Sequence, residues 1–143
     1  MSFLSPEVGL VISYSYLWRY EQQSGAEEGR KNRPCVIVIA VEKQDGNIVV
    51  TVVPITHLKP EGESLGIEMP PRVKQHLGLD DEKSWIIISE ANQFIWPGYD
   101  LRPIPGSKKK FSYGFLPPQL FEQIKSEMLK LIVKRRTNIT PRD

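Results

Sequence analysis

The stretch RPCVIVIAVEKQDGNIVVTVVPITH, residues 33–57, decides the fold. Two β-branched apolar runs, 35–41 and 48–54, flank a polar segment that contains Asp45-Gly46, a strong signal for a hairpin turn. Runs that are apolar at every position, rather than at alternate positions, indicate strands buried on both faces. The stretch therefore predicts an antiparallel β-hairpin in the core of the domain.

The register of this hairpin determines what lies at its open end. If the ends of the two runs, Val41 and Ile48, face each other, continued pairing sets Arg33 opposite Thr56. If Asp45-Gly46 forms a tight two-residue turn instead, Arg33 and Thr56 are diagonal neighbours. Both registers keep the two side chains on one face, because side chains alternate with a period of two, whereas a single bulge would separate them. We expect them to converge beside the polar loop that precedes the hairpin.

The residue types at this open end suit chemistry at a phosphate. Arg33 stays charged and offers a planar pair of donors to phosphate oxygens, and the Thr56 hydroxyl can donate to or accept from the same group. His57 follows at once, and histidine is the usual acid or base near neutral pH, but on a continuing strand it points away from Thr56. A cation and a hydroxyl stabilise charge at a phosphodiester, and the 2′-hydroxyl of RNA would supply the nucleophile.

The segments around the hairpin predict a mainly β domain with helices. The clearest element is a helix at 117–136, because its apolar residues recur at helical spacing and two prolines suit its first turn. In chain order, the other segments predict a strand at 9–18, a long loop at 19–33, a short strand at 66–70, a short helix at 71–79, a strand at 84–90, an irregular segment at 92–106 and an edge strand at 108–116. This order favours a small, strongly bent antiparallel β-barrel with a long C-terminal helix. We expect a single domain over 1–133 and a frayed tail at 134–143.

Composition excludes several classes of function. The chain has 143 residues and a formal net charge of +2, too small to argue for nucleic-acid binding by itself. One cysteine, Cys35, and two histidines, His57 and His76, argue against a disulfide framework and a zinc site, so we expect no metal and no cofactor. The sequence shows no signal peptide and no apolar run long enough for a membrane helix. We therefore expect a cytoplasmic protein.

The motifs around the hairpin resemble those of the PemK/MazF-like toxins of bacterial toxin–antitoxin systems. The resemblance covers about residues 8–132, with the landmarks in family order. These landmarks are GLVISYSY, EEGRKNRPCVIVIA, VVPIT, SWIIISEANQF and the closing amphipathic helix. The combination of a glycine and "RP" before one strand with "P-I-T" at the end of the next is the most specific part.

The resemblance implies a fold, an activity and partners. The fold is an SH3-like β-barrel, and the protein is a homodimer. The activity is metal-independent endoribonuclease cleavage of single-stranded RNA, including mRNA, at short sequences, leaving 2′,3′-cyclic phosphate and 5′-hydroxyl ends. The partner is a cognate antitoxin, whose disordered segment covers the RNA groove and with which the toxin binds DNA. The family's key arginine and threonine map to Arg33 and Thr56.

Some positions depart from the family pattern. Leu10 stands where the family usually has an acidic residue, and Ile88 stands where some members have an arginine two residues before the acid Glu90. The segment 92–103 replaces a more ordinary strand and turn. These departures concern base specificity more than fold.

The candidate site residues follow from these patterns, and each also has a purely structural interpretation. The catalytic candidates are Arg33 and Thr56, the possible supporting residues are His57 and Glu90, and the candidate RNA-binding residues are Arg30, Lys31, Asn92 and Trp96. Alternatively, Arg33 is a solvated flank, Glu90 a lone charge at a strand end, and Trp96 a plug for one end of the barrel. The alternative function is a non-catalytic binder on the same barrel, which holds RNA or inhibits a protein such as a topoisomerase. A peptide-recognition module is a third possibility.

Overall fold

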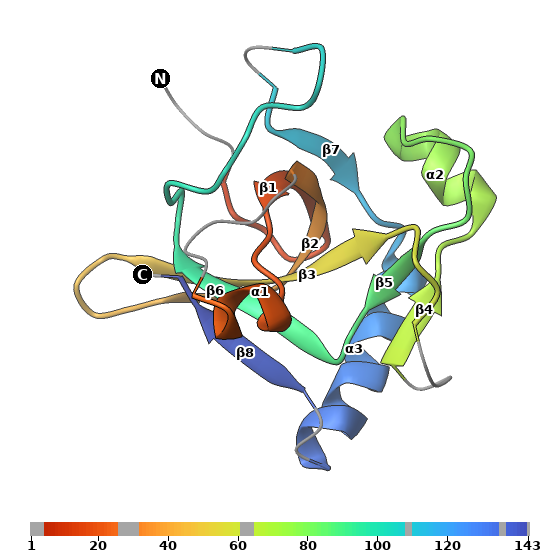
Figure 1. Cartoon of the computed structure of the whole chain (residues 1–143). Coiled ribbons are helices and arrows are strands. Elements are labelled where there is room, and N and C mark those ends of the chain that lie inside the picture. The colour runs from red at the N-terminus through yellow and green to blue at the C-terminus, as the bar shows by residue number, and fades with distance from the viewer. Residues whose placement is uncertain (1–4, 26–31, 61–64, 108–109, 135–136, 143) are drawn as a thin grey trace.

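The computed structural model describes residues 5–25, 32–60, 65–107, 110–134 and 137–142 of the chain. This part is mainly antiparallel β-sheet with helices, which confirms the predicted class (Figure 1). In chain order the elements are β1 (Leu10–Ser15), α1 (Arg19–Gln23), β2 (Asn32–Glu42), β3 (Ile48–Thr56), β4 (Gly66–Glu68), α2 (Pro71–Leu77), β5 (Trp85–Ile87), β6 (Glu90–Ile95), β7 (Ser112–Phe115), α3 (Pro118–Val133) and β8 (Asn138–Pro141). None of the helices in the described ranges is both long and apolar enough to cross a membrane.

The predicted hairpin is the centre of the sheet. β2 and β3 pair with each other, and the strand order is β4-β5-β3-β2-β1-β7, with β6 pairing with β3 and β8 pairing with β6. Alternate residues of β2 enter two different hydrophobic clusters, because successive side chains point to opposite faces of the sheet. The hairpin is therefore buried on both faces over its middle, as its unbroken apolar runs predict.

The C-terminal helix α3 covers one face of the sheet (Figure 1). Its buried side chains are Leu120, Ile124, Met128 and Leu131, at the helical spacing seen in the sequence. Burial of each such side chain is worth about 1.5–3 kcal/mol, so this stripe fixes the helix. The other face holds a cluster that includes Tyr14, Tyr16 and Phe94, with the rings of Tyr14 and Phe94 stacked at 4.7 Å.

Two segments that the sequence predicts to be irregular contain regular elements. The loop expected at 19–33 contains α1, whose first turn is capped because the Trp18 backbone N–H donates to Glu21 Oε1 at 3.1 Å. The irregular segment expected at 92–106 begins instead with β6, which pairs with β3 from Val49–Ile95 to Val52–Asn92. β6 is therefore fixed by pairing distant in sequence, whereas α1 is stabilised by a local cap.

The tail expected to fray at 134–143 is ordered over its described residues. β8 pairs in parallel with β6, from Glu90–Asn138 to Gln93–Pro141. Arg142 then enters the protein interior, where its Nη2 lies 2.8 Å from Asp100 Oδ1 and its Nη1 donates to Ser15 O and Asn92 Oδ1, each at 2.9 Å. The prediction of a frayed tail is wrong, because a buried ion pair fixes the chain end.

Candidate active site

The structure brings Arg33 and Thr56 to one place at the open end of the hairpin. The pair nearest that end is Cys35–Pro54, and the same register continued by two residues sets Arg33 opposite Thr56. Both residues line a cavity of about 760 Å³ and a second one of about 720 Å³. The predicted convergence is therefore present, since the two residues line both cavities.

The turn of the hairpin differs from both predicted turns, although the register at the open end is the same as in the first prediction. Glu42 pairs with Ile48, and the Lys43 N–H donates to Asn47 O, so residues 44–46 close the turn and Gly46 takes the left-handed conformation that such a loop requires. Continued without a change, the register at the turn would set Arg33 opposite His57 instead of Thr56. A β-bulge between Ile37 and Ile39 shifts the pairing by one residue. The bulge, which alone would separate Arg33 from Thr56, here restores their alignment.

Arg33 is half-buried and incompletely hydrogen-bonded. Its guanidinium carbon lies 5.0 Å from the centre of the Trp18 ring, a cation–π contact that holds the planar group. Its Nε is buried and has no hydrogen-bond partner among the described residues. Because buried donors are almost always paired, this atom needs an explanation. An anionic group entering either cavity would supply the missing acceptor.

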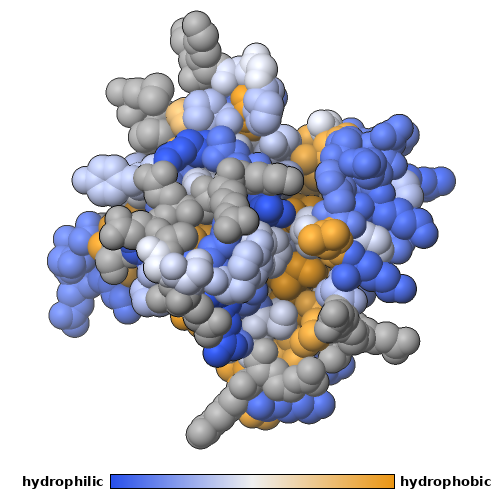
Figure 2. All heavy atoms as spheres, in the orientation of Figure 1, coloured by the Kyte–Doolittle hydropathy of each residue, from blue (hydrophilic) through white to orange (hydrophobic). Residues whose placement is uncertain are grey.

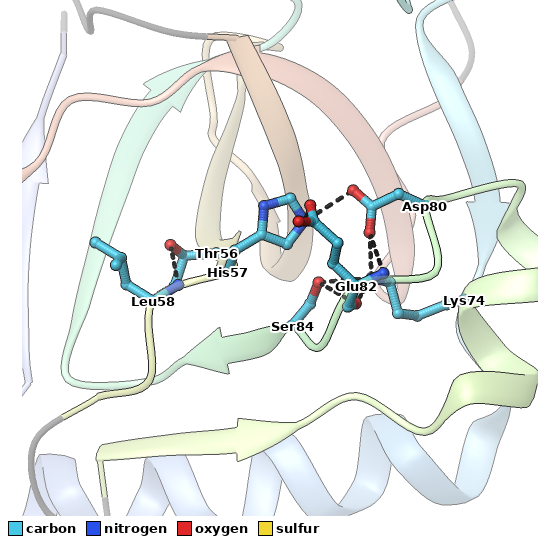
Figure 3. Close-up of polar contacts among 7 residues, drawn as sticks. All are labelled: Thr56, His57, Leu58, Lys74, Asp80, Glu82 and Ser84. Carbon is cyan, nitrogen blue, oxygen red and sulfur yellow. Dashed lines mark hydrogen bonds and ion pairs between the residues drawn. The ribbon is translucent and has the colours of Figure 1, made fainter.

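Thr56 ends β3 and thereby brings His57 into the site. Its Oγ1 accepts a hydrogen bond from the Leu58 N–H at 3.2 Å, so the hydroxyl proton remains available to a ligand (Figure 3). Because the strand ends here, His57 does not follow the alternation that would turn it away, and it lines the larger cavity with Arg33 and Thr56. The site therefore contains a cation, a hydroxyl and an imidazole.

A network that sequence reasoning missed holds His57. Its Nε2 lies 2.7 Å from Asp80 Oδ2, and Asp80 Oδ1 is 2.5 Å from Nζ of the buried Lys74 (Figure 3). Lys74 also donates to Ser84 Oγ at 2.8 Å and to the Glu82 carbonyl. Burial raises the pKa of Asp80, but hydrogen bonds from Lys74 and His57 outweigh this and lower it. Asp80 is therefore ionised near neutral pH.

The same network contains a set of metal ligands. One atom each of His57, Asp80 and Glu82 lie within 4.8 Å of one another, and all three residues are exposed. One nitrogen and two carboxylate oxygens suit a divalent transition metal. However, the Lys74 ammonium already neutralises Asp80 from the buried side. The expectation of no metal is thus open to direct test by chelation.

Glu90 lies in the smaller cavity with Arg33, but it is held by other residues. Its Oε1 accepts hydrogen bonds from the Tyr16 hydroxyl at 3.0 Å and from the Arg19 N–H at 3.1 Å. Burial raises the pKa of Glu90, and the hydrogen bonds from Arg19 and Tyr16 only partly offset that effect. Trp18 and Tyr20 also line this cavity, and sequence reasoning missed both.

The structure places the predicted RNA-binding residues in different environments, away from the Arg33–Thr56 site where they are described. Asn92 is wholly buried, and its side chain bonds the backbone N–H and carbonyl of Leu17 at 2.9 and 2.8 Å, so it has a structural role here and offers no exposed surface to RNA. Trp96 lines neither cavity: its backbone N–H donates to Ile48 O at the turn end of the hairpin, and its ring packs near Phe94, so its contact with RNA stays a prediction. Arg30 and Lys31 lie outside the described residues.

The surface around the site is mixed in character. Figure 2 shows apolar surface in the middle of this face, next to hydrophilic side chains over α2. Leu58, which lines both cavities, is 79% exposed. Comparison with protein-family models and with the curated proteins finds no match for this chain.

Proposed function

We propose that this chain is the toxin of a toxin–antitoxin system and a metal-independent, sequence-specific endoribonuclease acting on single-stranded RNA. The observation that supports this most is that Arg33 and Thr56 line the same two cavities, with the Arg33 Nε buried and unpartnered among the described residues. A buried cationic donor that lacks an acceptor suits a phosphate that arrives with the substrate.

The proposal extends to the fold and the partners. The bent sheet around the hairpin is an SH3-like β-barrel, and the protein is a homodimer. A cognate antitoxin covers the RNA groove with a disordered segment. With mRNA as the substrate, the toxin acts in the cytoplasm.

The proposed reaction uses the 2′-hydroxyl of the RNA as nucleophile. Its oxygen attacks the adjacent phosphorus, the P–O2′ bond forms, and the P–O5′ bond breaks. A base takes the proton of the 2′-hydroxyl, and the departing 5′-oxygen receives a proton. The products are a 2′,3′-cyclic phosphate and a 5′-hydroxyl, so no water is consumed.

Each site residue has a role in this reaction. Arg33 stabilises the negative charge that builds up on the pentavalent phosphorus group, and Thr56 donates to a non-bridging oxygen. His57 carries the proton, with its Nε2 held by ionised Asp80 at 2.7 Å, so that Nδ1 is the atom that faces the substrate. Asp80 is a positioning residue, because it acts through His57.

The test is incubation of the purified protein with long single-stranded RNAs in excess EDTA. We expect discrete cuts by the wild type, loss of those cuts in Arg33→Ala and Thr56→Ala, and unchanged cutting by Arg72→Ala, an exposed arginine on α2 outside both cavities. No cutting by the wild type across varied RNAs would contradict the proposal and favour a non-catalytic binder. Cuts that EDTA abolishes would instead assign a metal to His57, Asp80 and Glu82.

A further inference from the structure

The smaller cavity has an aromatic wall that the cleavage mechanism does not use. The rings of Trp18 and Tyr20 are nearly parallel, 18° apart, with centroids separated by 6.4 Å. Trp18 is partly exposed, and Tyr20 is 62% exposed, although both are large hydrophobic residues. The two rings line the cavity of about 720 Å³ that also contains Arg33 and Thr56. Flat, parallel and open rings beside a phosphate site resemble a stacking surface for bases.

The wall is rigid because its inner ring is held on several sides. Tyr16, which is buried, meets the Trp18 ring edge-on at 5.1 Å and 70°, and the Arg33 guanidinium lies 5.0 Å from its centre. The Trp18 backbone N–H is tied to Glu21, which begins α1. A ring fixed in this way loses little conformational freedom when a ligand stacks on it.

The cavity also contains an acceptor, the half-buried carboxylate of Glu90. Glu90 Oε1 is occupied by Tyr16 and Arg19, whereas Glu90 Oε2 accepts no hydrogen bond from the described residues. A carboxylate oxygen accepts well from an exocyclic amino group, as carboxylates do from the N4 amino group of cytosine. Uracil lacks such a group. The cavity therefore combines a stacking surface with an acceptor that distinguishes bases.

We propose that this cavity binds the nucleobase adjacent to the phosphate held by Arg33 and Thr56, and that Glu90 favours adenine, cytosine or guanine over uracil. The inference rests on the proposed function, because it takes single-stranded RNA as the ligand. Single-stranded RNA is read in this way elsewhere, by bases stacked on aromatic rings or arginine planes and hydrogen-bonded on their edges. A basic rim of Arg33 and Lys59 favours RNA over a proline-rich peptide, which also uses aromatic grooves.

The test measures binding of the trinucleotides UXU, with X as each of the four bases and a 2′-deoxyribose at both the first U and X, so that neither phosphodiester has an adjacent 2′-hydroxyl to attack it. We expect the wild type to bind the A, C and G forms several-fold more tightly than the U form, followed by intrinsic tryptophan fluorescence. Tyr20→Ala should weaken binding of the three amino-bearing bases by at least about fivefold, the lower end of stacking contributions. Glu90→Gln should narrow the gap between U and the others, because its amide donates to uracil carbonyls. Tyr99→Ala, a 93% exposed tyrosine outside the cavity, is the matched control and should bind as the wild type does.

Several results would overturn the inference. Equal affinities of the wild type for all four bases, or equal binding by Tyr20→Ala and Tyr99→Ala, would contradict the proposal that this cavity binds a base. Tighter binding of a proline-rich peptide that is lost in Tyr20→Ala would assign the cavity to peptides instead. Because the trinucleotides cannot be cleaved, these results are independent of the cleavage assay. A nuclease whose cavity binds no base would cleave RNA but bind the four trinucleotides equally. A base-binding protein without nuclease activity would discriminate among the trinucleotides but leave RNA uncut.

Discussion

At the scale of single residues, the buried Arg142 and the half-buried Arg33 differ in how fully their hydrogen-bond donors are satisfied. Arg142 has partners on both Nη atoms, including an ion pair with Asp100. Arg33 has the Trp18 ring and a buried Nε without a partner among the described residues. A cation–π contact is worth about 0.5–2 kcal/mol, whereas an unpaired buried donor costs about 1–3 kcal/mol or more when charged. The environment of Arg33 therefore does not stabilise the free protein, which is expected of a group kept for a ligand.

This difference predicts that Arg33 can be removed without loss of stability. In Arg33→Met we expect the free energy of unfolding to stay within about 0.5 kcal/mol of the wild type or to rise slightly, because an unpaired donor is replaced by an apolar chain. Cleavage should fall by roughly 10²–10³-fold, the effect of losing one charge-stabilising group. Chemical denaturation and the EDTA cleavage assay measure the two quantities. A large loss of stability would mean that Arg33 is structural.

A second residue-scale prediction concerns Asp80. In Asp80→Asn we expect the cleavage rate to fall by roughly 10–100-fold, part of what a positioned acid–base group contributes. Although burial opposes it, hydrogen bonds from Lys74 and His57 lower the pKa of Asp80, so its carboxylate is charged in a cleavage assay near neutral pH, and the single-turnover rate measured there reports the loss of its contact with His57 at 2.7 Å.

The matched control for that substitution is the next residue. Asp81→Asn makes the same change of charge at an exposed position outside the cavity. We expect it to leave the cleavage rate unchanged. If Asp80→Asn and Asp81→Asn gave the same loss of rate, the effect would come from net charge rather than from the contact with His57.

At the scale of elements, β8 shows how an unpromising sequence becomes ordered. Residues 138–141 have no alternating pattern, and the strand is short and pairs only with β6. The order comes instead from its far end, where Arg142 bonds Ser15, Asn92 and Asp100, on three separate segments. The side chain of Arg142 is only 2% exposed, so this cluster is a buried attachment of the chain end.

Substitution of Arg142 should therefore lower the stability of the fold, whereas substitution of Arg33 should not. Arg142→Met removes the ion pair with Asp100, whose side chain is 14% exposed, so we expect a loss of about 3–5 kcal/mol in the free energy of unfolding. Hydrogen exchange of the β8 backbone should also become faster, because the strand is attached at one end only. The double variant Arg142→Met, Asp100→Asn should recover part of the loss. A loss below about 0.5 kcal/mol, typical of surface substitutions, would contradict the role of Arg142.

At the scale of the whole molecule, the sequence predicts the strands and helices that its apolar pattern specifies, but few of the contacts between residues far apart in the chain. The hairpin and α3 follow from apolar runs and helical spacing, so they are predictable. The alignment of Arg33 with Thr56 was predicted, but the route to it was not, since a bulge and a shifted turn offset each other. Asn92 looks like a polar residue near the site, and its bonds to Leu17 and Arg142, which the sequence does not reveal, make it structural. The contact of Asp80 with His57 joins residues 23 positions apart, which no spacing rule predicts.

The overall charge makes a final prediction about how RNA is held. A formal net charge of +2 gives the molecule little long-range attraction for a polyanion, so binding must come from a few cations at the site. The described cations beside the Arg33–Thr56 pair that have no carboxylate partner are Arg33 and Lys59, and Lys74 is already paired with Asp80. For a single strand the slope of log affinity against log salt is about −0.7 for each phosphate neutralised, so we expect a shallow slope of about −1 to −2.

Fluorescence anisotropy of a labelled RNA bound to Thr56→Ala, between 50 and 300 mM salt, measures this slope. A slope near zero would mean that phosphates are not bound, and one steeper than about −4 would require a basic surface well beyond this site, because each further unit of slope needs more than one additional contact.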